Sequence, residues 1–483
     1  MSSNVGLDRY MLYPLAKWAA GLRYEDIPEA IAHQARMSLL DTIGCVIAGF
    51  SNPDNQNILS IDRELSAVGG KNAATVAVSG DPLSVPAAAK VNSCLASILE
   101  LDDNTAGHAS LVTVPVGLAV AEAYHLSGKA LLTSMVPTYE VIGRMLDSVF
   151  DTLKPSSECG MVPIAAPNTV GAAAQTAKLL GCDAKGTFNA MNVGLTFLPF
   201  CPQVNAKVGS QVKPLVFSGW HVYAGSFGAM YAKAGLSAAD DSYESEYGGY
   251  LRSVATRWDA SVLTEGLGKT WHLEAPNRKR HACCGYTHSS IDGCWDLLHE
   301  SNIRIADIAR IRVALPRAAY GLVGSPLLGN LTPRGAQFYL PYILAVGLIE
   351  NRPILPADTS AEALDRYLAT PHFSRLMQSI DVSLDADIAG RFSCRLQLAT
   401  KDGREYSSFV RDAVGRGERQ FTDQQIEEKF RITESPAGIG VPRGEADLLN
   451  WVNVFVFHSK LNGDLDRLSR QWLGGRLPPL PAL

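Results

Sequence analysis

The strongest constraint on the fold is the helical periodicity of the first 265 residues, in a chain of 483 residues of which only 19% are charged. From Ile31 to Ile47, apolar residues recur every fourth position, as on one face of a buried helix. Further segments share this periodicity, and many are rich in Ala and Gly, which allows helices to approach closely. They are 84–99, 112–127, 130–148, 167–180, 186–196, 216–235 and 259–267. The sequence therefore predicts a bundle of packed helices.

The pattern changes after Gly268. Residues 308–315 and 392–398 alternate between apolar and polar side chains, which is typical of strands. A turn at 401–403 then precedes a third alternating segment at 405–410, a combination that indicates a hairpin. Helices are expected between the strands at 287–300, 335–350 and 359–368. This part of the chain is therefore predicted to be an α+β module.

We predict a mainly α protein with a large all-helical domain over 1–269 and a smaller α+β domain over 270–412. Helical periodicity resumes at 422–431 and 444–472. The C-terminal segment, 413–483, is therefore expected to return to the helical domain.

Composition excludes several classes of protein. The net charge is −5, so the basic surface that nucleic-acid binders carry is not expected. The nine cysteines are scattered, without a CxxC pair, which indicates reduced thiols in a reducing compartment. The N-terminus lacks a signal-peptide pattern, and the uncharged stretches at 159–177 and 186–206 contain Pro, Asn and Gln. We therefore expect a cytoplasmic protein that binds neither membranes nor nucleic acid.

Short motifs for nucleotide or metal chemistry are not found: the chain has no Walker loop, no GxSxG and no HExxH. We therefore expect no cofactor and no metal. A different signal lies at 100–110, where Asp102, Asp103 and Asn104 precede His108. Acids beside a histidine can form a proton-transfer unit, in which a carboxylate fixes the imidazole tautomer. The alternative is a solvated acid pair at the end of a helix.

Two further segments place cations beside apolar sequence. In GSQVKP (209–214), Lys213 follows Ser210 in a stretch without acidic partners, so it either extends to solvent or serves a buried anion. In NRKRHACCGYTH (277–288), a run of cations leads into small apolar residues at the junction of the two domains, where ligand pockets favour forming. The alternative for this run is a solvated surface. Cys283, Cys284 and His288 have poor spacing for zinc.

A fourth segment, 333–342, contains Arg334, Gln337 and Tyr339, which either reach a pocket or belong to the start of a core helix. Across all these segments, cations and histidines outnumber acids. That balance suits a small polycarboxylate substrate, whose anionic groups require cationic partners in a desolvated site.

The chain resembles the MmgE/PrpD family from about residue 12 to 432. The resemblance rests on segments whose order and spacing are specific when taken together: DIPEAIAHQARMSLLDTIGCVIAGF (26–50), LASILELDDNTAGHAS (95–110), YEVIGR (139–144), GAAAQTAKLLG (171–181), GSQVKP (209–214), YESEYGGYL (243–251), KRHACCGYTHSSID (279–292) and AQFYLPYILA (336–345). The resemblance implies a helical domain with an α+β lid domain, a homodimer, and no requirement for a metal or an organic cofactor.

The resemblance also implies roles for single residues. Asp102 matches the acid pair of the family, His108 its downstream histidine, and Lys213 and Lys279 its two pocket lysines; His288 matches a histidine that follows. The segment from the acid pair to the histidine is shorter here than in the decarboxylase-like members and lacks their extra histidine. Two further positions where the family has histidines hold Val162 and Phe217. We therefore expect a less polar pocket and a bulkier or more alkylated substrate.

Our leading hypothesis is a cofactor-independent lyase that dehydrates or decarboxylates a citrate-like or aconitate-like carboxylate. Lys213 and Lys279 would hold the carboxylates, and replacing either by Met is expected to lower kcat/KM at least about a hundredfold with little change in Tm. His108 would carry the proton, and Asp102 would orient it or act as the base. Substrate-binding candidates are Asn104, Ser210, Arg278, Arg280, His281, His288, Arg334 and Tyr339. The alternatives are an isomerase or epimerase, or a rearrangement catalyst, that uses the same site, and a helical dimer without activity.

Overall fold

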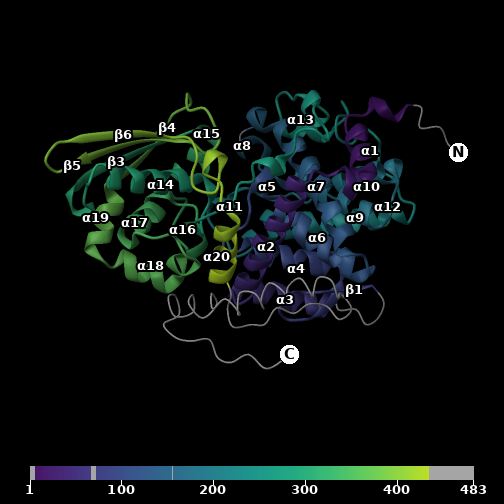
Figure 1. The fold of residues 1–483 in the computed structure, drawn as a ribbon, viewed down its shortest axis with the longest axis horizontal. Coiled ribbons are helices and arrows are strands. Elements are labelled where there is room, and N and C mark those ends of the chain that lie inside the picture. The colour runs from purple at the N-terminus through teal and green to yellow at the C-terminus, as the bar shows by residue number, and fades with distance from the viewer. Residues whose placement is uncertain (1–5, 67–71, 155, 434–483) are drawn as a thin grey trace. The chain divides into compact units, whose positions relative to one another are not determined.

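The computed structural model describes residues 6–66, 72–154 and 156–433 (Figure 1). The first domain is helical, which confirms the predicted fold class for this part of the chain. Its longer helices are α1 (Tyr13–Gly21), α2 (Glu29–Gly49), α3 (Pro53–Ser66), α4 (Val85–Ser97), α6 (Ser110–Ala123), α7 (Gly128–Asp147), α9 (Ala165–Leu179), α10 (Ala184–Thr196) and α12 (Trp220–Lys233). Short helices α5 (Thr105–His108), α8 (Ser156–Cys159) and α11 (Val204–Lys207) lie between them in the chain, and the short α13 (Tyr250–Val254) follows α12.

Three elements of this domain differ from the expectation. Helix α3 and a small hairpin of β1 (Ala73–Thr75) and β2 (Pro82–Ser84) are present where the sequence pattern predicted none. The helix expected at 259–267 is only the 3-10 turn η5 (Ala260–Leu263). It ends at Leu263 because Thr264, with a φ of −125°, already leaves helical geometry, and Gly266, with a φ of 65°, prevents the helix from resuming.

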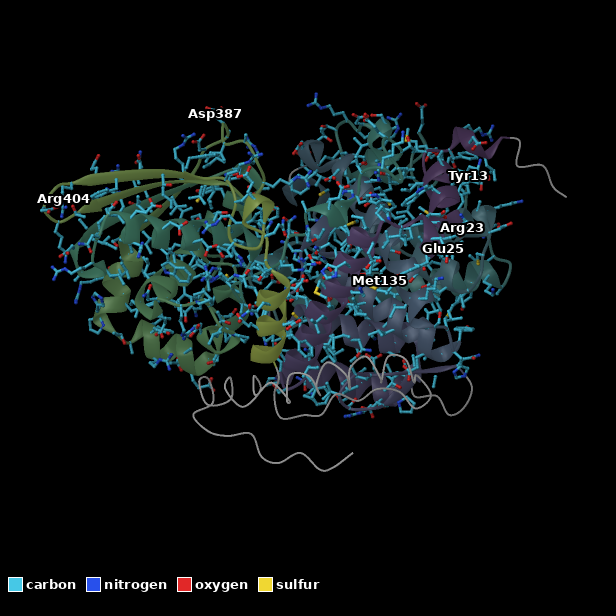
Figure 2. All side chains as sticks on the ribbon, in the orientation of Figure 1. Tyr13, Arg23, Glu25, Met135, Asp387 and Arg404 are labelled. Atoms are coloured by element: carbon cyan, nitrogen blue, oxygen red, sulfur yellow. The ribbon has the colours of Figure 1, made fainter. Side chains whose placement is uncertain are left out.

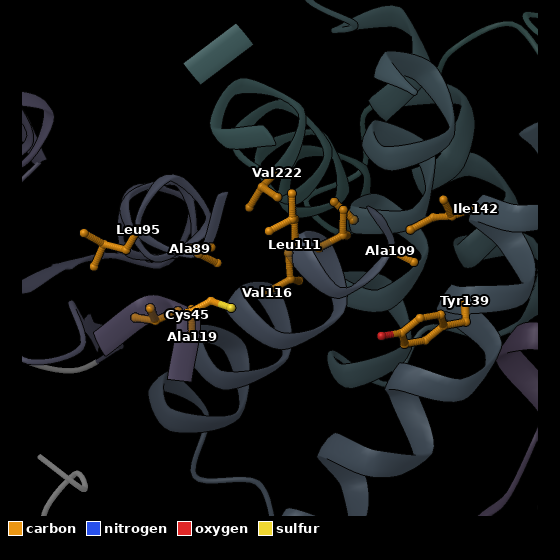
Figure 3. Packing of buried hydrophobic residues seen from close by; sticks show 14 of the residues in the cluster. Cys45, Ala89, Leu95, Ala109, Leu111, Val116, Ala119, Tyr139, Ile142 and Val222 are labelled. Atoms are coloured by element: carbon orange, nitrogen blue, oxygen red, sulfur yellow. The ribbon is translucent and has the colours of Figure 1, made fainter. Parts of the chain in front are cut away.

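Small residues determine how closely the helices of this domain pack. In Figure 3, Cys45 of α2, Ala89 of α4 and Ala119 of α6 lie together in the core, and all three are fully or almost fully buried. One such close approach involves α9, α10 and α12. A Cβ built on Gly225 of α12 would lie 2.2 Å from the backbone oxygen of Thr169 in α9. No side chain larger than hydrogen fits between these two backbones.

We therefore expect Gly225→Ala to destabilise the protein by roughly 1–3 kcal/mol, because the added methyl group meets backbone that cannot rotate away. The matched control is Gly128→Ala at the start of α7, where nothing lies within 4 Å of a built Cβ. This control should be neutral or slightly stabilising, since Ala favours helix over Gly by up to about 1 kcal/mol. Denaturant unfolding of the two variants measures the difference. Equal stabilities would contradict the packing described here.

The second domain contains a mixed four-stranded sheet in the order β4-β3-β5-β6. Its strands are β3 (Ile308–Leu315), β4 (Ile380–Leu384), β5 (Cys394–Thr400) and β6 (Glu405–Val410). Three of them correspond to predicted strands, and β4, which pairs in parallel with β3, was not predicted. The β5–β6 hairpin has its turn beside Arg404, at the outer end of the sheet in Figure 2.

Helices cover one face of this sheet (Figure 1). They are α14 (Gly285–Glu300), α17 (Leu340–Glu350), α18 (Ala361–Leu368) and α19 (Pro371–Gln378). Between α14 and the sheet lies a second apolar core, in which Ile291, Ile311 and Leu396 are buried. The single helix expected at 335–350 is instead α17 preceded by the short α16 (Pro333–Ala336).

The chain then returns to the helical domain. Helix α20 (Asp423–Thr433) packs on α2. Lys429 of α20 forms an ion pair with the buried Asp41 of α2 at 2.6 Å and donates to the backbone oxygen of Leu101 at 2.6 Å. The helix expected at 422–431 is thus present, and that expected at 444–472 lies outside the described residues.

The segment that links the two domains is attached to α7 through His272. Its Nδ1 lies 3.0 Å from Glu140 and its Nε2 lies 3.1 Å from Asp147. Burial disfavours the charged imidazole, but the two carboxylates outweigh burial and raise the pKa of His272 to about 9. This clamp lies a few residues before Asn277, where the chain enters the candidate active site.

Because the pKa of His272 is higher in the folded protein than the usual value of about 6.5, its ion pairs should stabilise the fold fully below pH 6.5. This stabilisation should disappear as the pH rises through 9. The difference in unfolding free energy between wild type and His272→Gln should therefore be largest near pH 6, at most about 3 kcal/mol. Denaturant unfolding of both proteins from pH 6 to 10 measures this. A difference that is constant with pH would contradict the clamp.

Candidate active site

Five charged or titratable side chains meet where the end of α4 and the loop after it face the linker to α14. They are Glu100, Asp102, His108, Lys213 and Lys279. Four of them come from two segments that the sequence singled out for chemistry, and Lys279 comes from a third. Their charged atoms form one connected network within the interior.

Glu100 lies at the centre of the network. One carboxylate oxygen accepts a hydrogen bond from Lys213, and the other accepts one from Lys279 at 2.8 Å. Lys213 also donates to the backbone oxygen of Ser97 at 3.3 Å. The lysines, separated by 66 positions in the sequence, are thus held together by one carboxylate. The sequence analysis assigned Glu100 no role, although it stands two residues before Asp102.

Asp102 connects Lys279 to His108. One of its oxygens lies 3.2 Å from Lys279 Nζ, and the other lies 2.5 Å from His108 Nδ1. The His108 side chain is 13% exposed, whereas the four other side chains of the network are buried to 2% exposure or less. His108 is therefore the member of the network that solvent or a ligand can reach.

The backbone that carries these groups is strained. Glu100, Ala106 and His108 have φ values of 53°, 51° and 64°, in the left-handed region that side chains disfavour. Gly107, between the last two, has a φ of 75°. Non-glycine residues of this kind cost of order 1–3 kcal/mol each and concentrate at functional sites. The strain places the imidazole of His108 beside Asp102.

Electrostatics keep the network ionised. Burial alone would raise the pKa of the Glu100 and Asp102 carboxyls, but Lys213 and Lys279 outweigh it at Glu100, and Lys279 and His108 outweigh it at Asp102. Both pKa values are therefore lowered. Burial likewise opposes the charge on Lys279, and the two carboxylates raise its pKa above the usual value. Two carboxylates thus face two ammonium groups, and protonation of His108 adds one positive charge.

One side of the site is apolar. The ring of Phe217 meets the imidazole of His108 edge to face, with centroids 4.9 Å apart. Lys213 Nζ lies 4.8 Å from the centroid of the same ring and 5.3 Å from the centroid of the Phe338 ring. Val162, by contrast, is buried and lines a small cavity with Tyr250 that none of the five network residues borders. Phe217 therefore borders the imidazole of His108 with an apolar ring.

The acid pair divides between two functions. Asp103 turns away from the network and accepts hydrogen bonds from Ser38 at 2.8 Å, from Tyr139 at 3.2 Å and from the backbone of Thr105 at 2.8 Å. Asn104 donates from its backbone to the oxygen of Asn277 at 2.9 Å. These contacts join the loop to the linker, so that Lys279 lies opposite Asp102.

The other predicted substrate-binding residues are placed as follows. Arg278 is buried and donates to Gln34 at 2.9 Å, within the helical domain. Arg280 and His281 both pair with Asp292 of α14, at 3.2 and 3.1 Å. All three therefore have protein partners outside the buried network.

His288 is buried on α14, and burial together with neighbouring cations lowers its pKa well below the usual value. Ser210 bonds to Asn205 at 3.0 Å, and Arg334 pairs with Asp54 at 3.2 Å. Tyr339 is partly buried against the second core. The turn at Gly209 abuts α16, because a Cβ on this glycine would overlap the backbone of Gly335.

Two further residues lie at the site: Gln337, which the sequence analysis named as able to reach a pocket, and Arg416, which it did not name. Gln337, in the break before α17, donates to the backbone oxygen of Ile98 at 3.3 Å and accepts from the backbone of Cys284 at 2.9 Å. Arg416 donates to the side chain of Asn104 at 3.0 Å. No local pattern in the sequence marks Arg416, because its partner lies 312 positions earlier.

Within residues 6–66, 72–154 and 156–433, no three His, Cys, Asp or Glu side chains are arranged to hold a metal ion. The helices in this part of the chain are also too short or too polar to cross a membrane.

The protein has two domains, one helical and one with a mixed sheet. It contains a buried network of acids, lysines and a histidine. Residues 14–261 match the MmgE/PrpD N-terminal domain, and residues 281–437 match the MmgE/PrpD C-terminal domain. The chain therefore belongs to the MmgE/PrpD family. It is an enzyme of this family that is distantly related to cis-aconitate decarboxylase.

Among curated proteins, the chain is 25% identical over 445 residues to "Cis-aconitate decarboxylase" of Aspergillus terreus. This match covers 86% of the chain and 88% of the relative. The chain is also 25% identical over 446 residues to "Cis-aconitate decarboxylase-like protein oryM" of Aspergillus oryzae. This second match covers 86% of the chain and 89% of the relative. Both similarities extend over the two domains.

Proposed function

We propose that this protein is a cofactor-independent lyase that dehydrates or decarboxylates a citrate-like or aconitate-like carboxylate. The observation that carries the proposal is the pairing of an accessible imidazole, His108, with a buried carboxylate, Asp102, beside two buried ammonium groups. The similarity to cis-aconitate decarboxylase supports a carboxylate as the substrate.

His108 moves the proton in this mechanism. Asp102 accepts the Nδ1–H of the imidazole, which leaves Nε2 free to take a proton from substrate or to give one to it. In decarboxylation, the carbon–carboxylate bond breaks, CO2 leaves, and protonated His108 donates its proton to the resulting carbanion. In dehydration, neutral His108 removes a proton beside a carboxylate, and the imidazolium formed gives that proton to the hydroxyl group, which departs as water.

Lys213 and Lys279 stabilise the negative charge that both reactions develop. Because each lysine is already paired with Glu100, they act mainly as fixed positive charges in a dry interior, without reorganising during the reaction. When His108 is protonated, the network carries three cations against two carboxylates. An anionic substrate then compensates the excess charge.

Phe217 supports an alkylated substrate. Its ring contacts the edge of the reactive imidazole, so the space next to the reacting carbon is bordered by an apolar face. An alkyl substituent on the substrate would bury apolar surface there, at about 25 cal/mol per Å².

The alternatives use the same site or none. An isomerase or epimerase would form the same carbanion and return the proton to another face or another carbon, and a single imidazole suits such a shuttle. A rearrangement catalyst for an alkylated precursor would depend mostly on the shape of the pocket. A helical dimer without activity would leave the network as a structural feature only.

One experiment separates these functions. The protein is incubated with cis-aconitate, 2-methylcitrate and longer alkylcitrates in deuterated buffer, with His108→Gln as the matched inactive protein. Release of CO2 indicates a decarboxylase, a change in alkene absorbance indicates a dehydratase, and deuterium uptake without net conversion indicates an epimerase. If no substrate changes, or if His108→Gln is equally active, the lyase proposal is wrong.

A homodimer is part of the proposal. Helix α12 presents an aromatic row in which Trp220 and Tyr231 are 40% and 39% exposed, and Tyr223 and Phe227 stack between them with centroids 5.6 Å apart. An exposed apolar row on one helix favours burial against a partner. Sedimentation should give twice the monomer mass for wild type, and Tyr231→Glu should shift it toward the monomer. A wild-type monomer at micromolar concentration would contradict this.

A further inference from the structure

Arg416 is a buried guanidinium with unused hydrogen-bond donors. It follows β6 in the chain, is 1% exposed, and lies 3.5 Å over the ring of Phe392. One amino group donates to Asn104, whereas Nε and the other amino group have no hydrogen-bond partner among the described residues. Desolvating a cation in this way is unfavourable unless an anion pairs with it.

The charge of Arg416 is not neutralised by a direct ion pair in the described part of the chain. Burial lowers the pKa of Arg416 to about 10, and the more distant carboxylates Asp412 and Asp103 offset this only in part. The guanidinium therefore remains charged at neutral pH, and its Nε and one amino group have no acceptor among the described residues.

The start of α14 points at the same place. A Cβ built on Gly285 would lie 2.6 Å from an Arg416 amino nitrogen and 2.7 Å from the Asn104 amide nitrogen. The N-cap residue, Cys284, makes no side-chain capping bond. The first turn of a 16-residue helix carries partial positive charge and free N–H groups. The guanidinium therefore lies directly against the partly positive end of the helix, and an anion bound to its unpartnered Nε and amino group would offset this repulsion.

The position is close to the proposed reaction centre. Asn104 is two residues beyond Asp102, and its backbone bonds to Asn277, two residues before Lys279. Two residues of chain span at most about 7 Å. Burial lowers the pKa of His288 in α14, and the positive charges of Arg416 and Lys279 lower it further. Both cations therefore act on the same histidine. The unused donors are therefore within reach of a small polycarboxylate whose other end meets His108.

We propose that Arg416, the Asn104 amide and the start of α14 bind a third carboxylate of the substrate, the one that a dicarboxylate lacks. This subsite rests on the proposed function, because it assumes that a polycarboxylate occupies the site around His108. It makes Arg416 a specificity-determining residue that favours tricarboxylates over dicarboxylates. Glycine is required at position 285, because a side chain there would collide with the guanidinium and with the Asn104 amide.

Two inert probes test the subsite by calorimetric titration. Tricarballylate has three carboxylates on a five-carbon chain, and glutarate has the same chain without the central carboxylate. Wild type should bind tricarballylate at least tenfold more tightly than glutarate. Arg416→Met should lose at least tenfold in affinity for tricarballylate and less than twofold for glutarate, and Arg416→Lys should lie between the two proteins.

Stability without ligand distinguishes a binding role from a structural role. Because its charge is buried without an ion-pair partner, Arg416→Met should melt at the same temperature as wild type or higher. The matched control is Arg391→Met: Arg391 lies 3.7 Å over Phe150 but pairs with Asp147 at 3.0 Å. This control should lower Tm and leave the affinity for both probes unchanged.

Several results would overturn the subsite: a wild type without preference for tricarballylate, an Arg416→Met variant that keeps the preference, or an Arg416→Met variant that unfolds readily without ligand. The lyase proposal is judged separately by turnover. An Arg416-dependent preference for tricarballylate without turnover of any substrate supports the subsite and contradicts the lyase proposal. Turnover without an Arg416-dependent preference removes the subsite and leaves the lyase.

Discussion

His108→Gln should reduce kcat by a factor of roughly 10²–10⁴, the usual contribution of a positioned general acid or base. Glutamine has a similar size and can still hydrogen-bond to Asp102, but it cannot carry a proton between substrate and solvent. The imidazole is the accessible end of a network whose other members are buried, so no neighbouring group readily replaces it. Turnover is measured per folded molecule on whichever carboxylate the wild type converts.

His125→Gln is the matched control for this variant. His125 is also a histidine with a left-handed backbone, with a φ of 52°, and its side chain is exposed. The two substitutions should change Tm by similar, small amounts, whereas only the change at His108 should affect kcat. If His108 serves only to close the turn before α6, its variant will lose stability and retain activity.

Lys279→Met should destabilise the protein by about 3–5 kcal/mol in addition to removing activity. The lysine is fully buried between Glu100 and Asp102, so its loss leaves two buried carboxylates with one fewer cation. From the sequence alone, we expected a substrate-binding lysine whose replacement leaves Tm almost unchanged. The ion pairs give the opposite expectation for stability, because an uncompensated buried charge is costly.

Lys129→Met is the matched control for the buried lysine. Lys129 also pairs with a glutamate, Glu25, at 2.6 Å, but its side chain is 57% exposed. Such surface pairs contribute at most about 1 kcal/mol. Denaturant unfolding of both variants measures the contrast. A loss of less than 1 kcal/mol at Lys279 would show that the buried network is not held together by its charges.

The fold was predictable where it depends on neighbours in the sequence. The four-residue spacing from Ile31 to Ile47 corresponds to α2, and the alternation at 308–315 corresponds to β3, because burial of one face imposes the period of the element. Strand β4 has only five residues, and its burial does not follow a clear alternation. An element this short carries too few positions for a period to be recognised.

The candidate site was predictable in part. Asp102, His108, Lys213 and Lys279 stand in segments whose unusual composition, and then the family resemblance, drew attention to them. Asp103 has the same residue type as Asp102 but contacts Ser38 and Tyr139 instead. Which of two adjacent acids faces the network depends on the backbone conformation of the loop, and the sequence pattern does not specify it.

The sequence by itself determined the helical and mixed-sheet classes of the two domains and the segments that carry the chemistry, because these follow from the period of burial and from local composition. Only the tertiary structure decided the partners of the charges. Glu100 meets Lys213 and Lys279 across 113 and 179 positions, and Arg416 meets Asn104 across 312. Such contacts arise when packed helices and the returning chain bring distant side chains together in a low-dielectric interior. There, the energy of each charge depends on all the groups near it in space, and these groups cannot be identified from the residues adjacent to it in the sequence.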